Sequence, residues 1–124
     1  MNSQRLFALR GAVSVDDNTE AAILAGTREL VEAIMERNQL APEQLVSCVF
    51  SATTDLNAQF PAVAARDMGL SRVPLLCTQE IDVPGALPRV IRVLLHYYAA
   101  PDHSPQHVYL REARSLRADL EAAQ

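Results

Sequence analysis

The fold is decided by the segment DNTEAAILAGTRELVEAIMERN, residues 17–38, which holds the clearest helical pattern of the sequence. Side chains that recur every three or four residues form one stripe, made up of Ile23, Leu24, Thr27, Leu30, Val31, Ile34 and Met35. The opposite side carries the charges, on Glu20, Glu29, Glu32, Glu36 and Arg37. Asp17, Asn18 and Thr19 come before the stripe and are residue types that cap a helix N-terminus. The pattern predicts a long amphipathic helix that lies on a sheet.

The strands of that sheet are predicted from short apolar segments at residues 5–13, 45–52, 73–80, 89–98 and 107–110. In the first of these, alternation places Leu6, Ala8 and Arg10 on one face and Phe7 and Leu9 on the other. Segment 89–98 could be a helix or a strand, and its β-branched residues, two tyrosines and preceding Pro88 favour a strand. Prolines mark the remaining elements, which are a helical turn at Pro42, a short helix 62–68 after Pro61 and a turn at Pro84–Gly85.

These elements define a small α+β fold, with about five strands and one long helix in a single domain of 124 residues. The long helix can cover only one face of the sheet. Because the sequence offers no second long helix for the other face, we expect the chain to form a homo-oligomer through it.

Composition excludes several classes of protein. A hydrophobic share of 49% is too high for a disordered chain. The net charge is −4 and there is no basic cluster, so nucleic acid is a poor candidate for a partner. All 11 cations are Arg, which suits bidentate capture of carboxylate or phosphate, although compositional bias explains this equally well. No membrane span or targeting segment is visible, and Cys48 and Cys77 lack metal-ligand spacing. We expect a cytoplasmic protein with reduced thiols.

Polar residues within apolar segments are the candidates for chemistry, namely Arg10, Cys77, Glu80, Arg92 and Tyr109. Each also has an ordinary explanation, such as a solvated strand position, an ion pair between Glu80 and either Arg, or packing in the core. His96, His103 and His107 lack metal spacing, and the two that flank a loop are expected to be solvated. The sequence contains no GxSxG, Gly-rich phosphate loop or HExxH. Spacing alone leaves Cys–His nucleophilic catalysis open, but nothing in the sequence positions a base beside either thiol. We therefore expect that an enzyme with this sequence needs no nucleophile, metal or cofactor.

Nearly the whole chain resembles the AroH class of monofunctional chorismate mutases, through LRGAV (9–13), NTE (18–20), SATTDLNAQFPAVAAR (51–66), CTQEIDVPGALPRVIRVL (77–94) and HVYLREARSLR (107–117). The resemblance implies one chorismate mutase domain over residues 1–117. The end of the chain has helical propensity but little apolar stripe, so we expect residues 118–124 to form a mobile tail. The same resemblance implies a homotrimer, in which the sheets form a pseudo-barrel and the active sites lie at subunit interfaces. The implied reaction is the isomerisation of chorismate to prephenate in aromatic amino-acid biosynthesis, with no cofactor or metal.

The resemblance also implies a role for each matching residue. Arg92 matches the cation on the ether oxygen and a carboxylate of chorismate. Arg10 matches a clamp on the side-chain carboxylate, assisted by the hydroxyl of Tyr109. Glu80 and Cys77 match positions that hydrogen-bond the ring hydroxyl, with Glu80 as an acceptor. The remaining matches line the substrate site or its mouth: Phe60, Ala62, Leu75, Leu116, Arg66 and Arg117.

Two positions depart from the pattern of this class. Val63 stands where a Lys is usual, which is expected to weaken substrate affinity more than the chemical step. Leu76 stands where a small hydroxyl residue is common. Two other functions stay open. One is a non-catalytic trimer that binds a small carboxylate, and the other is an enamine or imine deaminase in which Glu80 activates water.

Overall fold

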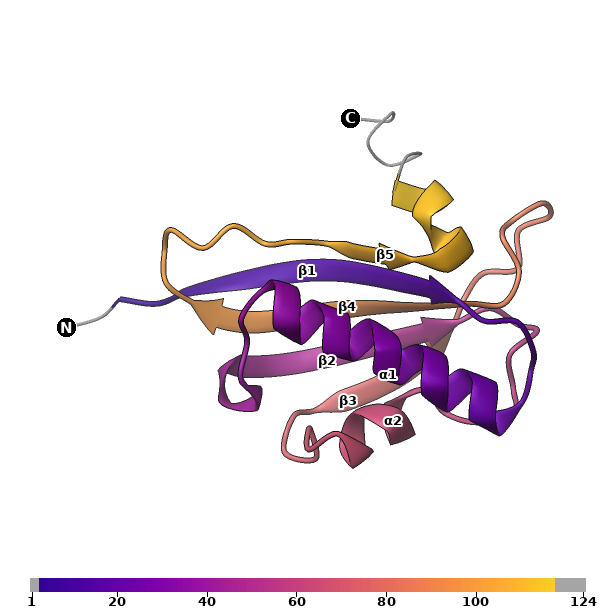
Figure 1. Ribbon diagram of the computed structural model, residues 1–124, viewed down its shortest axis with the longest axis horizontal. Helices are drawn as coiled ribbons and strands as arrows, with labels where there is room; N and C mark the ends of the chain where they lie inside the picture. The colour runs from indigo at the N-terminus through magenta and orange to yellow at the C-terminus, as the bar shows by residue number, and fades with distance from the viewer. Residues whose placement is uncertain (1–2, 118–124) are drawn as a thin grey trace.

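A five-stranded mixed sheet, with the strand order β3-β2-β4-β1-β5, forms one layer of the structure (Figure 1). The computed structural model describes residues 3–117. The strands are β1 (Arg5–Ser14), β2 (Leu45–Ala52), β3 (Leu75–Gln79), β4 (Val90–Ala99) and β5 (Val108–Leu110). Strand β4 runs antiparallel to β1 and β2, whereas the outer pairs β1–β5 and β2–β3 are parallel. The predicted α+β class is confirmed.

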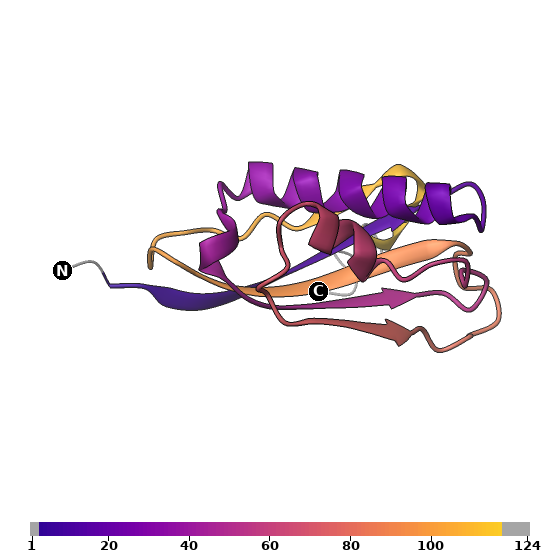
Figure 2. The same ribbon diagram turned by 90° about the horizontal axis from the view of Figure 1, so that it is seen from below.

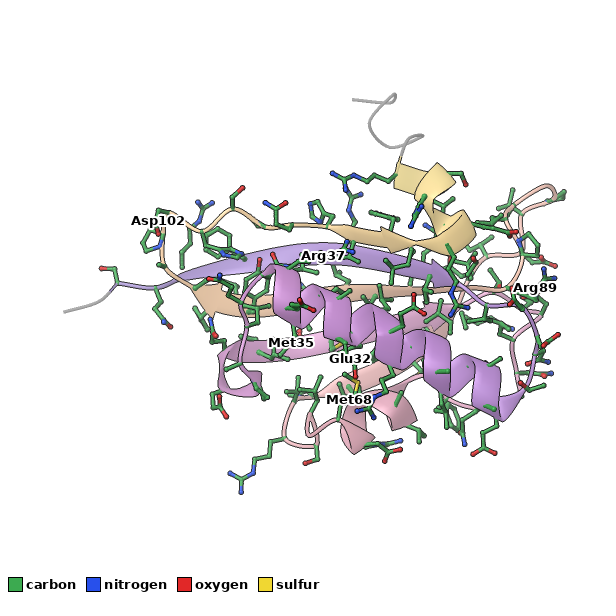
Figure 3. All side chains as sticks on the ribbon, in the orientation of Figure 1. Glu32, Met35, Arg37, Met68, Arg89 and Asp102 are labelled. Carbon is green, nitrogen blue, oxygen red and sulfur yellow. The ribbon has the colours of Figure 1, made fainter. Side chains whose placement is uncertain are left out.

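Helices α1 (Glu20–Arg37) and α2 (Ala62–Asp67) lie on the same face of this sheet, as Figure 2 shows. Short 3-10 turns occur at Pro42–Gln44 and Arg111–Ala113. Met35 of α1 and Met68, just after α2, lie close together where the two helices meet (Figure 3). Within residues 3–117, no helix combines the length and the apolar character that crossing a membrane requires.

Helix α1 confirms the prediction for residues 17–38 in its type and in its buried face. The Oγ1 of Thr19 accepts the N–H of Ala22 at 3.1 Å and so caps the helix. The buried side chains come from the predicted stripe, apart from Gly26: Ile23, Gly26, Thr27, Leu30, Val31 and Ile34. Gly26 allows a close approach to β1, because a Cβ at this position would lie 2.4 Å from Cγ1 of Val15.

Strand register sorts the side chains of the sheet into two faces. Facing the helices is a row formed by Gly11, Val93, Phe50 and Cys77, which are paired across neighbouring strands. The open face carries the intervening row, formed by Tyr109, Ala12, Arg92, Ser51 and Thr78. The core therefore lies between the sheet and α1, and polar side chains collect on the other side.

Helices α1 and α2 leave the open face uncovered, as expected from the sequence (Figure 2). Four large apolar side chains on it are between 39% and 59% exposed: Leu6, Leu76, Leu94 and Tyr98. Part of this face, around Ala12 and Tyr109, is covered by the segment that follows β5, through Ala113 and Leu116.

Element boundaries differ from the predictions by a few residues. Segment 89–98 is the strand β4, as favoured, whereas the strand predicted at 73–80 is limited to Leu75–Gln79. Residues 111–117 are helical, and Ala113 is fully buried. The mobile tail predicted at 118–124 lies outside the described residues.

Candidate active site

A cavity of about 400 Å³ lies on the open face of the sheet, where the polar row crosses β5, β1, β4, β2 and β3. Its lining includes four of the predicted site residues, Arg10, Glu80, Arg92 and Tyr109. They come from four segments far apart in the sequence. The cavity also has apolar walls, because the side chains of Val49 and Leu94 line it.

Arg92 and Glu80 form the charged centre of this cavity. Nε of Arg92 lies 2.6 Å from Oε1 of Glu80, and the side chains are 40% and 22% exposed. The Nε–H of Arg92 is nevertheless buried without a directed hydrogen bond to any described residue. The contact is therefore an attraction between charges and not a well-directed hydrogen bond.

Glu80 is held from a second side by Ser51. The hydroxyl of Ser51 donates a short hydrogen bond to Oε2 of Glu80. Both carboxylate oxygens of Glu80 thus have a partner, Ser51 on β2 and Arg92 on β4, which fixes the carboxylate as an acceptor that faces the cavity.

The start of β4, which carries Arg92, is fixed by a network of backbone contacts. Arg89 has a positive φ of 52°, and its N–H donates to both carboxylate oxygens of Asp55 at 3.0 and 3.2 Å. Its Nε donates to the carbonyl of Val15 at 3.1 Å. Arg89 therefore joins the ends of β1 and β2 to β4, at the end of the sheet where Figure 3 labels it.

A second group of predicted residues lies at the β3 edge and not in this cavity. Phe60 is 65% exposed and lines a separate cavity of about 430 Å³ together with Cys77. The loop before Phe60 is fastened to the start of α1, because Oδ1 of Asn18 accepts the N–H groups of Asn57 and Ala58 at 3.0 and 3.1 Å. Thr78 lines both cavities.

The side chain of Cys77 does not join Glu80 in the structure. Cys77 lies in the row that faces the helices, and it packs against the core together with Leu75. Alternation along β3 is the reason, because Cys77 is an odd number of residues from Glu80.

The other predicted residues surround these two places. Ala62 and Arg66 are on α2, where Ala62 is buried and Arg66 exposed, and Val63 is half-buried between them. Leu116 packs beside Tyr109, and Arg117 follows it. Sequence reasoning missed Ser51 and Thr78, which line the cavity, because only the pairing of Ser51 with Arg92 and with Thr78 brings them to the site.

The prediction that two of the histidines are solvated is wrong. His103 is half-buried, with Nε2 lying 2.6 Å from the hydroxyl of Tyr97. His107 is half-buried and accepts a backbone N–H with Nδ1. His103 thus satisfies a polar group of β4, and His107 one of β1. Among the described residues, no group of His, Cys, Asp or Glu side chains gathers in a way that could hold a metal ion.

The fold and the cavity define a small α+β protein that presents two guanidinium groups, one carboxylate and one phenol to a ligand on an open sheet face. This set can bind and orient an anionic ligand without forming a covalent bond to it.

Comparisons with known proteins identify the family. The family described as chorismate mutase type I matches residues 6–120. A chorismate mutase AroH of Thermus thermophilus is 49% identical over 118 residues, which cover 94% of this chain and 97% of that protein. A chorismate mutase AroH of Bacillus subtilis is 44% identical over 114 residues, 90% of each chain. The solved structure of a chorismate mutase from Clostridium thermocellum superimposes with a TM-score of 0.83 at 43% identity, and the match covers 88% of this chain and 98% of that one.

The chain therefore belongs to the type I chorismate mutase family, the AroH class. The resemblance drawn from the sequence is confirmed, and neither a carboxylate-binding module nor a deaminase is favoured.

Proposed function

We propose that the enzyme converts chorismate to prephenate by holding the substrate in a folded conformation and stabilising the charge that develops on its ether oxygen. Chorismate carries two carboxylates, a ring hydroxyl and a bridging ether. Its rearrangement is unimolecular, and the breaking C–O bond places negative charge on the ether oxygen. Fixed cations and restricted substrate motion are sufficient for such a reaction. The observation that carries the proposal is the placement of Arg10 and Arg92 on the lining of one cavity.

Arg92 is the proposed donor to the ether oxygen and to one carboxylate. Its side chain lines the cavity and is 40% exposed, which supports this role, because a guanidinium carries further N–H donors for an acceptor on the substrate. The nearby Glu80 holds the guanidinium in place before the substrate arrives. A preorganised donor needs no rearrangement when the charge develops.

Arg10 and Tyr109 are proposed to bind the side-chain carboxylate, and Glu80 to accept the ring hydroxyl. Arg10 is exposed on β1, and Tyr109, buried on β5, lines the same cavity. Cys77 is proposed to contribute at the ring hydroxyl through its backbone, since its side chain faces the core.

We further propose that the active protein is a homotrimer and that each site is completed by a second subunit. Phe60, at the β3 edge, lies outside the cavity that holds Arg92. A neighbouring subunit whose β3 edge lay over this cavity would supply Phe60, Ala62, Leu75 and Arg66. Leu116 and Arg117 follow the segment that borders Tyr109 and are proposed to lie at the site mouth. The exposed apolar side chains of the open face support such an interface.

The remaining parts of the proposal concern the domain and its location. Residues 1–117 are proposed to form one domain, which is supported by a single sheet and its helix layer. A cytoplasmic location is supported by the two free thiols, Cys48 and Cys77, because disulfides are rare in the cytoplasm.

The direct test mixes purified protein with chorismate and follows the loss of its diene absorbance, with the acid-quenched product identified as phenylpyruvate. Turnover to prephenate is expected, together with a trimeric mass by light scattering. A folded protein that binds chorismate without converting it would refute catalysis and favour a binding module. A monomeric protein with full activity would refute the composite site.

A further inference from the structure

The imidazole of His107 adds a hydrogen bond at one end of the pairing between β1 and β5. Its Nδ1 accepts the backbone N–H of Arg10 at 2.9 Å. The parallel register pairs Gly11 with Val108, so His107 stands beside Arg10, one step before the first pair of the ladder. A side chain thus provides the acceptor for Arg10 where strand β5 has not yet begun.

We propose that His107 is a positioning residue, which fixes the backbone of Arg10 relative to Tyr109 and so sets the geometry of the carboxylate clamp. The inference rests on the roles proposed above for Arg10 and Tyr109. Both residues line the cavity, whereas His107 does not, so His107 acts through the backbone of Arg10.

The segment that carries His107 is itself anchored to α1. Asn38, only 5% exposed, donates from Nδ2 to the carbonyl of Gln106 at 3.0 Å. Its Oδ1 accepts the N–H of Gln106 at 2.7 Å. The residue before His107 is therefore held at both backbone polar groups. From this anchor the chain reaches Tyr109 in three residues, so His107 links a fixed segment to the strand of Arg10.

The contact requires a neutral imidazole. Nδ1 can accept a hydrogen bond only when it carries no proton, which assigns the proton of His107 to Nε2. Burial lowers the pKa of His107 from its ordinary value of 6.5, and the positive charges of Arg10 and Arg117 lower it further. On the side of α1, the neighbouring group is the neutral Asn38, through Gln106. His107 is therefore neutral at neutral pH, and its acceptor is lost only as the pH falls through this lowered pKa.

Two substitutions distinguish the role of the hydrogen-bond acceptor of His107 from the role of its imidazole ring. His107→Ala removes the acceptor and leaves the N–H of Arg10 unsatisfied, whereas His107→Asn retains an oxygen one bond beyond Cγ, where Nδ1 stands. We expect His107→Ala to raise KM for chorismate about tenfold, with a smaller effect on kcat, because the carboxylate is bound in the ground state and the transition state alike. His107→Asn should stay within about threefold of the wild type, since it keeps the hydrogen bond. His103→Asn is the matched control, because His103 belongs to the same loop but contacts Tyr97; it should leave KM unchanged.

An Arg10→Ala background distinguishes positioning from a general effect on the fold. The backbone N–H of residue 10 remains in that variant, so a purely structural role would make His107→Ala equally harmful in both backgrounds. In the Arg10→Ala background, we expect the loss of kcat/KM caused by His107→Ala to fall to about twofold or less. This is the margin within which the effects of independent substitutions add. In the wild type, kcat/KM should decline at acid pH toward the value of His107→Ala, and His107→Asn should lack this decline.

An equal loss from His107→Ala in both backgrounds would overturn the inference, as would a folded His107→Asn variant as impaired as His107→Ala. If His107→Ala does not fold, the KM of His107→Asn and the pH profiles of the wild type and His107→Asn still test the inference. A wild-type KM in Arg10→Ala alone would instead refute the role of Arg10 within the proposed function.

Discussion

Replacing Arg92 by Ala should abolish most of the turnover while leaving the fold intact. Removal of one preorganised donor lowers kcat by about 10²- to 10³-fold. The structure adds a second contribution, because Oε1 of Glu80 lies 2.6 Å from Nε of Arg92 and would lose its counter-charge. Two unit charges 4 Å apart interact by about 4 kcal/mol at an effective dielectric constant of 20. An uncompensated Glu80 beside an anionic substrate therefore deepens the loss beyond about 10³-fold.

The two contributions can be separated with Glu80→Gln, which keeps an acceptor oxygen but removes the charge. Glu80→Gln alone should lower kcat about tenfold. In the Glu80→Gln background, Arg92→Ala should lower kcat only by the factor of about 10² to 10³ that the lost donor accounts for. Arg92→Lys should fall between the wild type and Arg92→Ala, because it keeps the charge without the planar fork.

The assay is the initial rate of chorismate loss at saturating substrate, with folding checked by circular dichroism and the melting temperature. Because Arg92 is 40% exposed, its ion pair contributes at most about 1 kcal/mol to the free energy of unfolding. A kcat within tenfold of the wild type for Arg92→Ala would refute the electrostatic role. An identical loss in the Glu80 and Glu80→Gln backgrounds would refute the contribution of the uncompensated carboxylate.

Three further predictions concern other parts of the molecule. Gly26→Ala should lower the free energy of unfolding by about 1–2 kcal/mol in urea titrations, because overpacking against Val15 outweighs the gain in helix propensity. In a Val15→Ala background, which lacks the clashing Cγ1, the additional cost of Gly26→Ala should largely disappear. Val63→Lys should lower KM for chorismate about fivefold at low salt, with kcat unchanged, and a gain that persists in molar salt would contradict an electrostatic cause. Burial raises the pKa of Cys48 from 9.0 to about 12. Because the thiol then ionises first in the unfolded chain, the free energy of unfolding should fall as the pH rises above 9. Cys48→Val should remove this part of the pH dependence.

Local signals in the sequence predicted most of the elements and the four residues at the centre of the site. The Thr19 cap and the spacing of Ile23 to Ile34 identify α1 without any tertiary information. Arg10, Glu80, Arg92 and Tyr109 stood out because a polar side chain within an apolar segment needs a partner or a cavity. The cavity then joins four segments that the sequence separates.

Other features depend on how the strands pair, which no local pattern encodes. The order β3-β2-β4-β1-β5 and its register place Ser51 beside Glu80, and a Ser near the end of a strand is otherwise unremarkable. The contact of His107 with Arg10 spans 97 residues, so the local sequence, a histidine beside a loop, indicates only a solvated side chain. The face of Cys77, by contrast, could have been predicted, because alternation in the segment 73–80 already separates it from Glu80.

The same alternation that builds the core determines which face holds the site. Leu9, Gly11 and Val13 must face α1, since Gly11 leaves only enough room for Ile34 and Leu30 of the helix. Arg10 must then point to the open face, and the register with β4 brings Arg92 to the same side. A slip of one residue in β4 would expose the core positions and turn Arg92 toward the helices. Changes that move the register of β4, such as loss of the Asp55 contacts that fix Arg89, should therefore reduce catalysis and stability together, whereas substitutions of Arg92 itself should separate them.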